Sequence, residues 1–189
     1  MGGITDRPLT RPDNPWRPAR EVGHHPPMTT TPTVEIRLAT PADAALLARL
    51  NEFVHGVHAA RRPDVFRADP PAGELVAIFE AFLARADCLA FVAQSAGHPI
   101  GYATATIHTR PGDALMRPRS FISLEHLAVD PAATRRGAGT ALVDAVRTAG
   151  KEAGCTALLT DVWDFNTKAM AFFEASGFVP MRHWLEQPL

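Results

Sequence analysis

The chain lacks the cysteines, the net charge and the long apolar runs that define several classes of protein. Its two cysteines, Cys88 and Cys155, are too few for a disulfide framework, so we expect a reduced, cytoplasmic protein. Nineteen basic and twenty acidic residues give a formal net charge of −1, and no global charge favours nucleic acid or an anionic membrane as partner. No apolar run approaches the roughly 18 residues that a membrane-spanning helix needs.

Metal-binding spacing and a signal sequence are also missing. The eight histidines form no H-x-x-x-H pattern, and His55-x-x-His58 is a weak substitute for one, so we expect no metal site. Residues 1–27 hold six of the seventeen prolines but lack the apolar segment of a signal peptide. We expect a disordered tail at residues 1–27 and a single domain at residues 28–189, with Met28 as an alternative start of translation.

Apolar periodicity and turn residues predict an α/β chain with a mixed sheet. In its first half the expected elements are a strand at 34–38, a helix from Thr40-Pro41 to the residue before Pro63, a helix around 75–83, and strands at 88–94 and 100–108 about a turn at 97–99. After a loop at 109–119, they are a strand at 120–129, a helix at 137–153, a strand at 157–162, a helix capped by Asn166 and a closing strand at 178–185. The strand–helix–strand unit over 120–162 implies that its two strands are parallel.

The junction between the strand at 120–129 and the helix at 137–153 has the features of an anion site. Asp130-Pro131 stops the strand, and the helix begins at two glycines, Gly137 and Gly139. A helix N-terminus leaves backbone N–H groups unpaired, and glycines let a phosphate approach them closely. Arg135 and Arg136 would add charge-assisted hydrogen bonds. The loop therefore suits a pyrophosphate, although a glycine-softened turn with solvated arginines is the alternative.

Two spaced motifs resemble those of the GCN5-related N-acetyltransferase (GNAT) superfamily. Thr134-Arg135-Arg136-Gly137-Ala138-Gly139 is similar to that family's acetyl-CoA loop, Arg/Gln-x-x-Gly-x-Gly/Ala, with Thr134 at the usual Arg or Gln. The stretch from Asn166 to Phe178 resembles the family's Asn-x-x-Ala-x-x-Phe-Tyr-x-x-x-Gly-Phe segment. A dinucleotide-binding fingerprint fits less well, because Leu142 stands at its third glycine. The resemblance covers roughly residues 121–180 and implies the element order β-α-α-β-β-β-α-β-α-β, with splayed central parallel strands.

The resemblance implies an activity for residues 28–189 as a single N-acetyltransferase domain. Acetyl-CoA would be the co-substrate, and its acetyl group would pass to a primary amine of a small molecule or peptide by direct attack in a ternary complex. Two alternatives remain open, a non-catalytic sensor that holds acyl-CoA and an N-acyltransferase that uses a longer acyl-CoA. Similar proteins often dimerise through the C-terminal strand, so a homodimer is also compatible with the sequence.

Glu125 is the candidate catalytic base. It lies in an otherwise apolar strand, where an unpaired carboxylate is costly, and many family members carry a glutamate at this position. Pairing with a nearby arginine is the structural alternative. We expect His126 to lie on the opposite face in a structural role, while Asp161 is a weaker alternative base or an ion-pair partner.

By resemblance, further residues would bind the co-substrate. They are the backbone groups of Leu127 and Val129, the loop residues Arg135, Arg136, Gly137, Ala138, Gly139 and Thr140, and the side chains of Asn166 and Phe173. Phe173 departs from the family, which usually has a tyrosine there to protonate the leaving thiolate. Tyr102 is the single tyrosine, and its position gives no reason to place it at the sulfur. We therefore expect water or the acceptor's own proton to suffice.

The acceptor site is expected over the first two helices and the 109–119 loop. A group of residues near the end of the first helix could line it or could be ordinary solvated residues: His55, His58, Arg61, Arg62, Pro63 and Phe66. Their mixed charges do not select among a polyamine, an amino acid, an aminoglycoside or a protein N-terminus.

Overall fold

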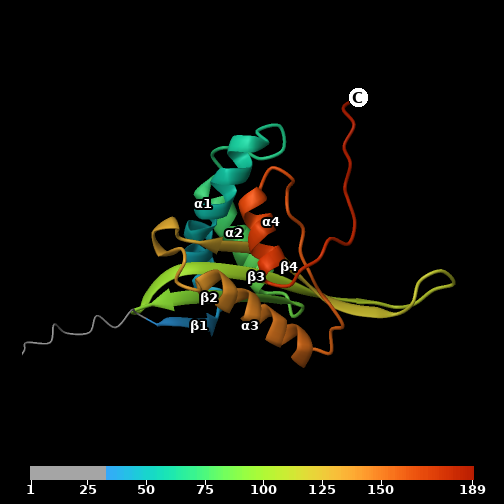
Figure 1. The fold of residues 1–189 in the computed structure, drawn as a ribbon. Helices are drawn as coiled ribbons and strands as arrows, with labels where there is room; N and C mark the ends of the chain where they lie inside the picture. The colour runs from blue at the N-terminus through green and yellow to red at the C-terminus, as the bar shows by residue number, and fades with distance from the viewer. Residues whose placement is uncertain (1–32) are drawn as a thin grey trace, which may run out of the picture. The chain divides into compact units, whose positions relative to one another are not determined.

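The computed structural model describes residues 33–189, so the expected tail at residues 1–27 and Met28 lie outside the described part. The elements, in chain order, are β1 (Val34–Leu38), η1 (Pro41–Asp43), α1 (Ala44–Arg61), α2 (Ala72–Leu83), β2 (Cys88–Ser95), β3 (His98–Arg110), β4 (Arg119–Val129), η2 (Pro131–Ala133), α3 (Ala138–Glu152), β5 (Leu158–Leu159) and α4 (Thr167–Ala175). The α/β class and the predicted order are confirmed as far as α4 (Figure 1).

Within residues 33–189 the strands form one mixed sheet in the order β1-β2-β3-β4-β5. The first four strands are antiparallel, and β5 runs parallel to β4, as the strand–helix–strand unit predicted. One face carries a core built with α1 and α2, in which Leu47 and Phe79 belong to one buried cluster with Val92 and Tyr102. The other face carries the α3 core, in which Leu142 and Val146 pack with strand residues. Consecutive residues of β3, Tyr102 and Ala103, belong to opposite cores, because side chains alternate across a strand.

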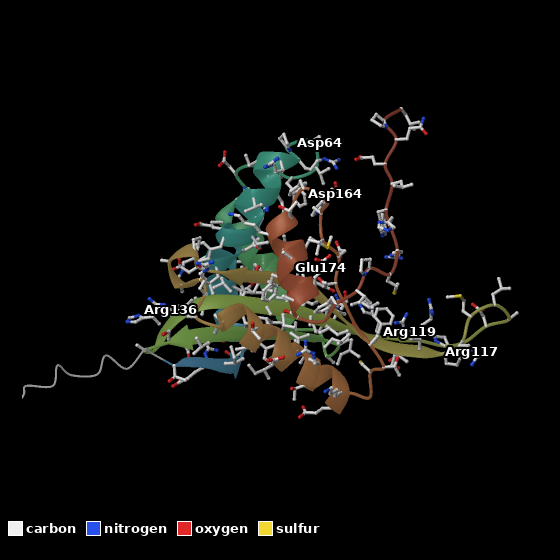
Figure 2. All side chains as sticks on the ribbon, viewed as in Figure 1. Asp64, Arg117, Arg119, Arg136, Asp164 and Glu174 are labelled. Atoms are coloured by element: carbon white, nitrogen blue, oxygen red, sulfur yellow. The ribbon has the colours of Figure 1, made fainter. Side chains whose placement is uncertain are left out.

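Two hairpins differ from their predicted bounds. The β2–β3 turn consists of Ala96 and Gly97, whose φ angles of 50° and 77° are the left-handed pair of a tight two-residue turn, so the expected turn at 97–99 is one residue late. β3 and β4 stay paired as far as Arg110 and Arg119. The expected loop at 109–119 is therefore shortened to residues 111–118 at the tip of an extended hairpin, where Figure 2 labels Arg117.

A β-bulge interrupts β4 at Glu125. Leu127 pairs with Ala103 and His126 with Thr104, but Ala105 pairs with Leu124, so Glu125 is an extra residue without a partner on β3. The backbone N–H of His126 donates to Thr104 Oγ1 at 3.1 Å. A bulge changes the direction of the side chains beside it.

β5 is much shorter than the expected strand at 157–162. Its ladder with β4 consists of the pairs Ile122–Leu158 and Ser123–Leu159, after which the two segments separate. Thr160 Oγ1 still donates to Leu124 O at 3.1 Å. This early end of the ladder leaves the second half of β4 without a neighbour on that edge in the described residues, which agrees with the splay that the family resemblance implied.

The expected closing strand at 178–185 is wrong, since this segment has no regular secondary structure. Phe178 packs edge-on against Phe173 with ring centroids 5.2 Å apart, and its N–H donates to Phe173 O. Pro180 then removes a backbone donor. A strand needs an edge to pair with, and the two-residue β5 supplies hardly any.

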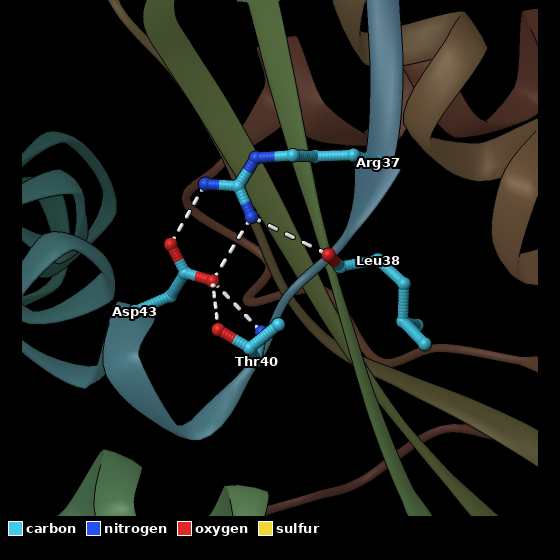
Figure 3. A network of polar contacts seen from close by, with 4 residues as sticks. All are labelled: Arg37, Leu38, Thr40 and Asp43. Carbon is cyan, nitrogen blue, oxygen red and sulfur yellow. Dashed lines mark hydrogen bonds and ion pairs between the residues drawn. The ribbon is translucent and has the colours of Figure 1, made fainter.

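Local side-chain bonds fix the starts of the helices around the site. Asp43 accepts from Thr40 N at 2.7 Å and from Arg37 at 2.7 and 2.9 Å, which joins β1 to the start of α1 (Figure 3). Asn166 caps α4 as predicted, with its Oδ1 accepting from Ala169 N at 3.2 Å. Gly137 caps α3 with φ of 81°, a conformation that glycine adopts without strain.

Candidate active site

A cavity of about 940 Å³ opens beside the second half of β4. Its walls come from α1, α2 and the segment before it, β4, the start of α3, the residues after β5, and α4. The predicted site residues that line it are Glu125, Leu127, Val129, Arg135, Gly137, Ala138, Gly139, Thr140, Asn166 and Phe173. Arg136 is absent from the lining, and Figure 2 shows its side chain directed outward from the loop.

The second half of β4 has, among residues 33–189, no neighbouring strand on the edge that borders the cavity. Asp130 N donates to Ile100 O and His126 N donates to Thr104 Oγ1, so both N–H groups point toward β3. Because successive residues of a strand direct their N–H groups to opposite edges, those of Leu127 and Val129 point the other way. On that edge the β5 ladder has already ended. The pair can therefore bind an extended polar ligand.

The start of α3 forms the electropositive end of the cavity. The first backbone bond of the helix joins Ala141 N to Gly137 O at 2.9 Å, so the N–H groups of the three residues between them precede the helical ladder. Arg135 and Lys168 line the same cavity. Thr134, which departs from the family pattern, closes the preceding turn by donating from Oγ1 to Pro131 O at 2.9 Å. This arrangement suits an anion with several oxygens.

Gly139 leaves little room beside it. A Cβ at this position would stand 3.3 Å from the ring of Phe172 and 3.9 Å from Val129 Cγ2. The Cα of Gly139 is thus packed against α4 and β4, while the peptide groups around it begin the helix. The close approach of a phosphate that the sequence predicted here stays a prediction, and the packing against Phe172 is an additional reason for glycine at this position.

Two adjacent residues of β4, Glu125 and His126, both line the cavity. The expectation that His126 lies on the opposite face is wrong, because the bulge at Glu125 breaks the alternation of side chains. His126 is exposed at the cavity, and the partial desolvation of its ring by neighbouring groups lowers its pKa below the usual value for histidine. Asp161 also lines the cavity, just after β5 rather than within it.

Aromatic rings form the far wall of the cavity. Phe66 stacks on His58 with centroids 5.2 Å apart and meets Trp163 edge-on at 5.5 Å. Burial, followed by the nearby His55, lowers the pKa of His58. Arg62 lies over Trp163, 5.1 Å from its ring centroid, and forms ion pairs with Asp64 and Glu186.

The expected acceptor residues divide between the cavity and its surroundings. His55, His58 and Phe66 line it, whereas Arg61, Arg62 and Pro63 do not. Residues 109–119 also contribute nothing to the lining, because the long hairpin carries them away from it (Figure 1). The prediction that the 109–119 loop borders the site is therefore wrong.

Sequence reasoning missed several residues of the lining, among them Asn51, Trp163 and Lys168. Asn51 could have been noticed as a buried amide within an otherwise apolar helix face. Trp163 follows the carboxyl end of a parallel strand, a common place for ligand-binding residues. No local signal marks Lys168, which lies in the first turn of α4.

Comparisons with known proteins identify the family and the fold of the chain. Residues 54–178 match the model of the acetyltransferase (GNAT) family. The BH1408 protein of Bacillus halodurans, solved as a tetramutant, is 27% identical with a TM-score of 0.77, covering 82% of this chain and 99% of its own. A transcriptional regulator from Bacillus halodurans C-125 is 22% identical with a TM-score of 0.66, covering 82% and 99%. No curated protein matches the chain.

An aminoglycoside N-acetyltransferase, AAC(6')-Iy, shares the fold at 22% identity and a TM-score of 0.61, covering 85% of this chain and 97% of its own. It was solved in complex with CoA and also with the bisubstrate analogue CoA-S-monomethyl-acetylneamine.

No helix among residues 33–189 has the length and apolar character required to cross a membrane.

Proposed function

We propose that this chain, which belongs to the acetyltransferase (GNAT) family, transfers an acetyl group from acetyl-CoA to a primary amine of a small molecule or peptide. The observation that carries the proposal is one cavity of about 940 Å³ that combines an open helix N-terminus, an unpaired strand edge and carboxylates. The first two features suit the two polar parts of CoA, its pyrophosphate and its pantetheine amides. The carboxylates suit an acceptor that arrives as a cation.

The co-substrate would be held mainly by backbone groups. The N–H groups at the start of α3, from Ala138 to Thr140, would bind the pyrophosphate, with Arg135 adding a charge-assisted bond. Leu127 and Val129 would bind the pantetheine arm through the β4 backbone and hold the thioester carbonyl near the carboxylates. Asn166 lines the cavity from the cap of α4 and would contact CoA beside Phe173. Arg136 lies outside the cavity lining and would contribute to CoA binding only through its positive charge.

Glu125 would act on the acceptor amine. A primary alkyl amine resembles lysine, whose pKa is about 10.4, and is therefore mostly protonated at neutral pH. The Glu125 carboxylate attracts that ammonium and takes a proton from it, directly or through water. Asp161 adds a second negative charge at the same cavity. Phe173 cannot donate a proton to the leaving sulfur, so water supplies it.

The acceptor would bind between α1, α2 and the aromatic wall. His58, Phe66 and Trp163 offer ring surfaces there, which suit the apolar body of an amine or stack against its cationic end. The likeness to AAC(6')-Iy makes an aminoglycoside one member of the panel to be tested. A peptide N-terminus, a polyamine and an aryl-alkylamine are the others.

The test measures release of free thiol from acetyl-CoA in the presence of sisomicin, spermidine, phenethylamine or a short peptide, each supplied in turn. The proposal expects amine-dependent thiol release, with a product heavier than the acceptor by one acetyl group. Binding of acetyl-CoA without turnover by any amine or by water would favour a sensor. Faster turnover of a longer acyl-CoA would change the donor while keeping the reaction class.

A further inference from the structure

His126 is connected to a buried hydrogen-bonded pair. Its Nδ1 lies 3.1 Å from the hydroxyl oxygen of Tyr102, and that hydroxyl donates to Asn51 Oδ1 at 2.7 Å. Tyr102 is fully buried and Asn51 is 6% exposed. Three elements, α1, β3 and β4, therefore contribute one polar chain that ends in a ring at the cavity.

Counting protons in this chain assigns the tautomer of His126. A phenol carries one proton, and the Tyr102 proton goes to the Asn51 oxygen, which is an acceptor. The Tyr102 oxygen must then accept from His126, so Nδ1 of the ring carries the hydrogen. In a neutral imidazole the other nitrogen, Nε2, then holds a free lone pair.

Aromatic neighbours hold one side of this ring, while the residue is exposed to the cavity. Phe79 and Tyr102 meet it edge-on, each with centroids 6.2 Å from the His126 centroid. Burial of the ring lowers the pKa of His126 most, Glu125 on its own strand raises it, and the nearby His58 and His55 on α1 lower it. Burial also raises the pKa of Tyr102, so its phenol stays protonated. At neutral pH the ring is thus a neutral base.

We propose that His126 Nε2 is a second proton acceptor of this site, working beside Glu125 and oriented by Tyr102 and Asn51. The inference rests on the proposed function, and it explains how an acceptor that arrives as an ammonium can react. Such an acceptor must lose two protons before it becomes an amide. The Glu125 carboxylate and the neutral His126 ring are neighbours, and each can take one of these two protons.

The step balances as follows. Glu125 takes one proton from the ammonium, and the nitrogen lone pair forms a bond to the thioester carbonyl carbon. As the C–S bond breaks with its electron pair on sulfur, His126 Nε2 takes the second nitrogen proton. The thiolate is protonated by water, and the two bases release their protons to solvent, so the products are the N-acetyl compound, CoA thiol and one net proton.

The first experiment needs no acceptor. In uniformly ¹⁵N-labelled protein, the ring signals of His126 are identified by their loss in His126→Gln. We expect an unprotonated Nε2 at pH 7, titration below the ordinary value of about 6.5, and loss of the Nδ1–H preference in Tyr102→Phe. Asn51→Asp, which keeps an acceptor oxygen, should preserve the tautomer. A hydrogen on Nε2 at pH 7 in the wild type would overturn the proposal.

The second experiment measures kcat against pH by thiol release, using the fastest amine of the panel or water if no amine reacts. We expect His126→Gln to lower kcat by about 10²–10⁴-fold and to remove the acidic limb, while acetyl-CoA binds with unchanged affinity. Glu125→Gln should lower kcat but retain that limb, and His98→Gln, an exposed residue outside the cavity, should behave like wild type.

The proposed function and the proposed role of His126 are refuted by different results. Absence of acetyl-CoA binding to the wild type would refute the proposed function, whatever the ring signals show. Binding and turnover that persist within threefold of wild type in His126→Gln would refute the base alone. A Tyr102→Phe protein that moves the tautomer without any change in the acidic limb would also refute it.

Discussion

Arg37 and Asp43 form a two-bonded ion pair, with nitrogen–oxygen distances of 2.7 and 2.9 Å (Figure 3). Arg37 belongs to β1, and Asp43 precedes the first residue of α1. The pair therefore fixes the direction in which α1 leaves the sheet. Since α1 carries Asn51 and His58, this contact also positions one wall of the cavity.

Replacement of Asp43 by asparagine should lower the free energy of unfolding by about 1–2 kcal/mol at pH 7, because it removes a charged cap and a partly exposed ion pair. Arg37 holds the pKa of Asp43 far below its usual value. The contribution is therefore complete above pH 4 and is lost as the pH falls below that value. Urea titrations at pH 7 and pH 3 measure it. An Asp87→Asn control, at an exposed pair with Arg85, should change less.

Gly150→Ala should destabilise the protein, although alanine is the better helix former. A Cβ at Gly150 would stand 2.6 Å from Ile122 Cγ2, so α3 would be pushed away from β4 at a cost of about 1–3 kcal/mol. Gly56→Ala, in α1 with nothing within 4 Å of its Cβ position, should instead stabilise by up to about 1 kcal/mol. Thermal unfolding of the two variants compares them. Equal shifts of the same sign would show that α3 does not pack as described.

Phe66→Ala should raise the KM for the acceptor amine by about tenfold and leave acetyl-CoA affinity unchanged, because an aromatic contact and its buried area are lost on the acceptor side only. Steady-state kinetics with the best acceptor of the panel measure the first quantity, and calorimetry measures the second. Trp184→Ala is the control, since Trp184 is 81% exposed and lies outside the cavity lining. A matched loss of acetyl-CoA binding in Phe66→Ala would contradict the assignment of this wall.

The kcat profile should show no basic limb from an enzyme acid. Phe173 lines the cavity without a hydroxyl, and the Tyr102 hydroxyl is buried and bonded to Asn51. Neither group can protonate the leaving sulfur. Measurement of kcat from pH 7 to pH 10 tests this, and a falling limb that disappears in Tyr102→Phe would contradict it. Phe173→Tyr should introduce such a limb.

The parts of the fold that the sequence predicted correctly depend on neighbours along the chain. The Asn166 cap, the Gly137 start of α3 and the parallel pair around α3 each follow from a short contiguous segment. The proposed anion loop is likewise a short contiguous segment, so its residues could be named before its surroundings were known, and its role in binding stays a prediction. Arg136 was the exception, because the direction of an exposed side chain is not fixed by the motif.

The errors concern contacts between distant segments. The bulge at Glu125 carries no glycine or proline, so the side of His126 could not be inferred from alternation. The length of β5 and the structure of residues 178–185 depend on which strands have a free edge for pairing. The strand propensity of the residues themselves does not reveal this. The aromatic wall joins Phe66 and Trp163, about a hundred residues apart along the chain, so no local pattern could have revealed it.

The most direct test of the central claim is calorimetric titration of acetyl-CoA into wild type, Gly139→Glu and Gly56→Glu. At Gly139 the new side chain enters the start of α3 and brings a negative charge to the anion site, while a carboxylate near a helix N-terminus does not itself weaken the helix. Gly56→Glu adds the same charge on an exposed part of α1. Our account predicts binding to wild type and Gly56→Glu and at least a hundredfold loss in folded Gly139→Glu. Equal binding to all three proteins, or none to wild type, would contradict it.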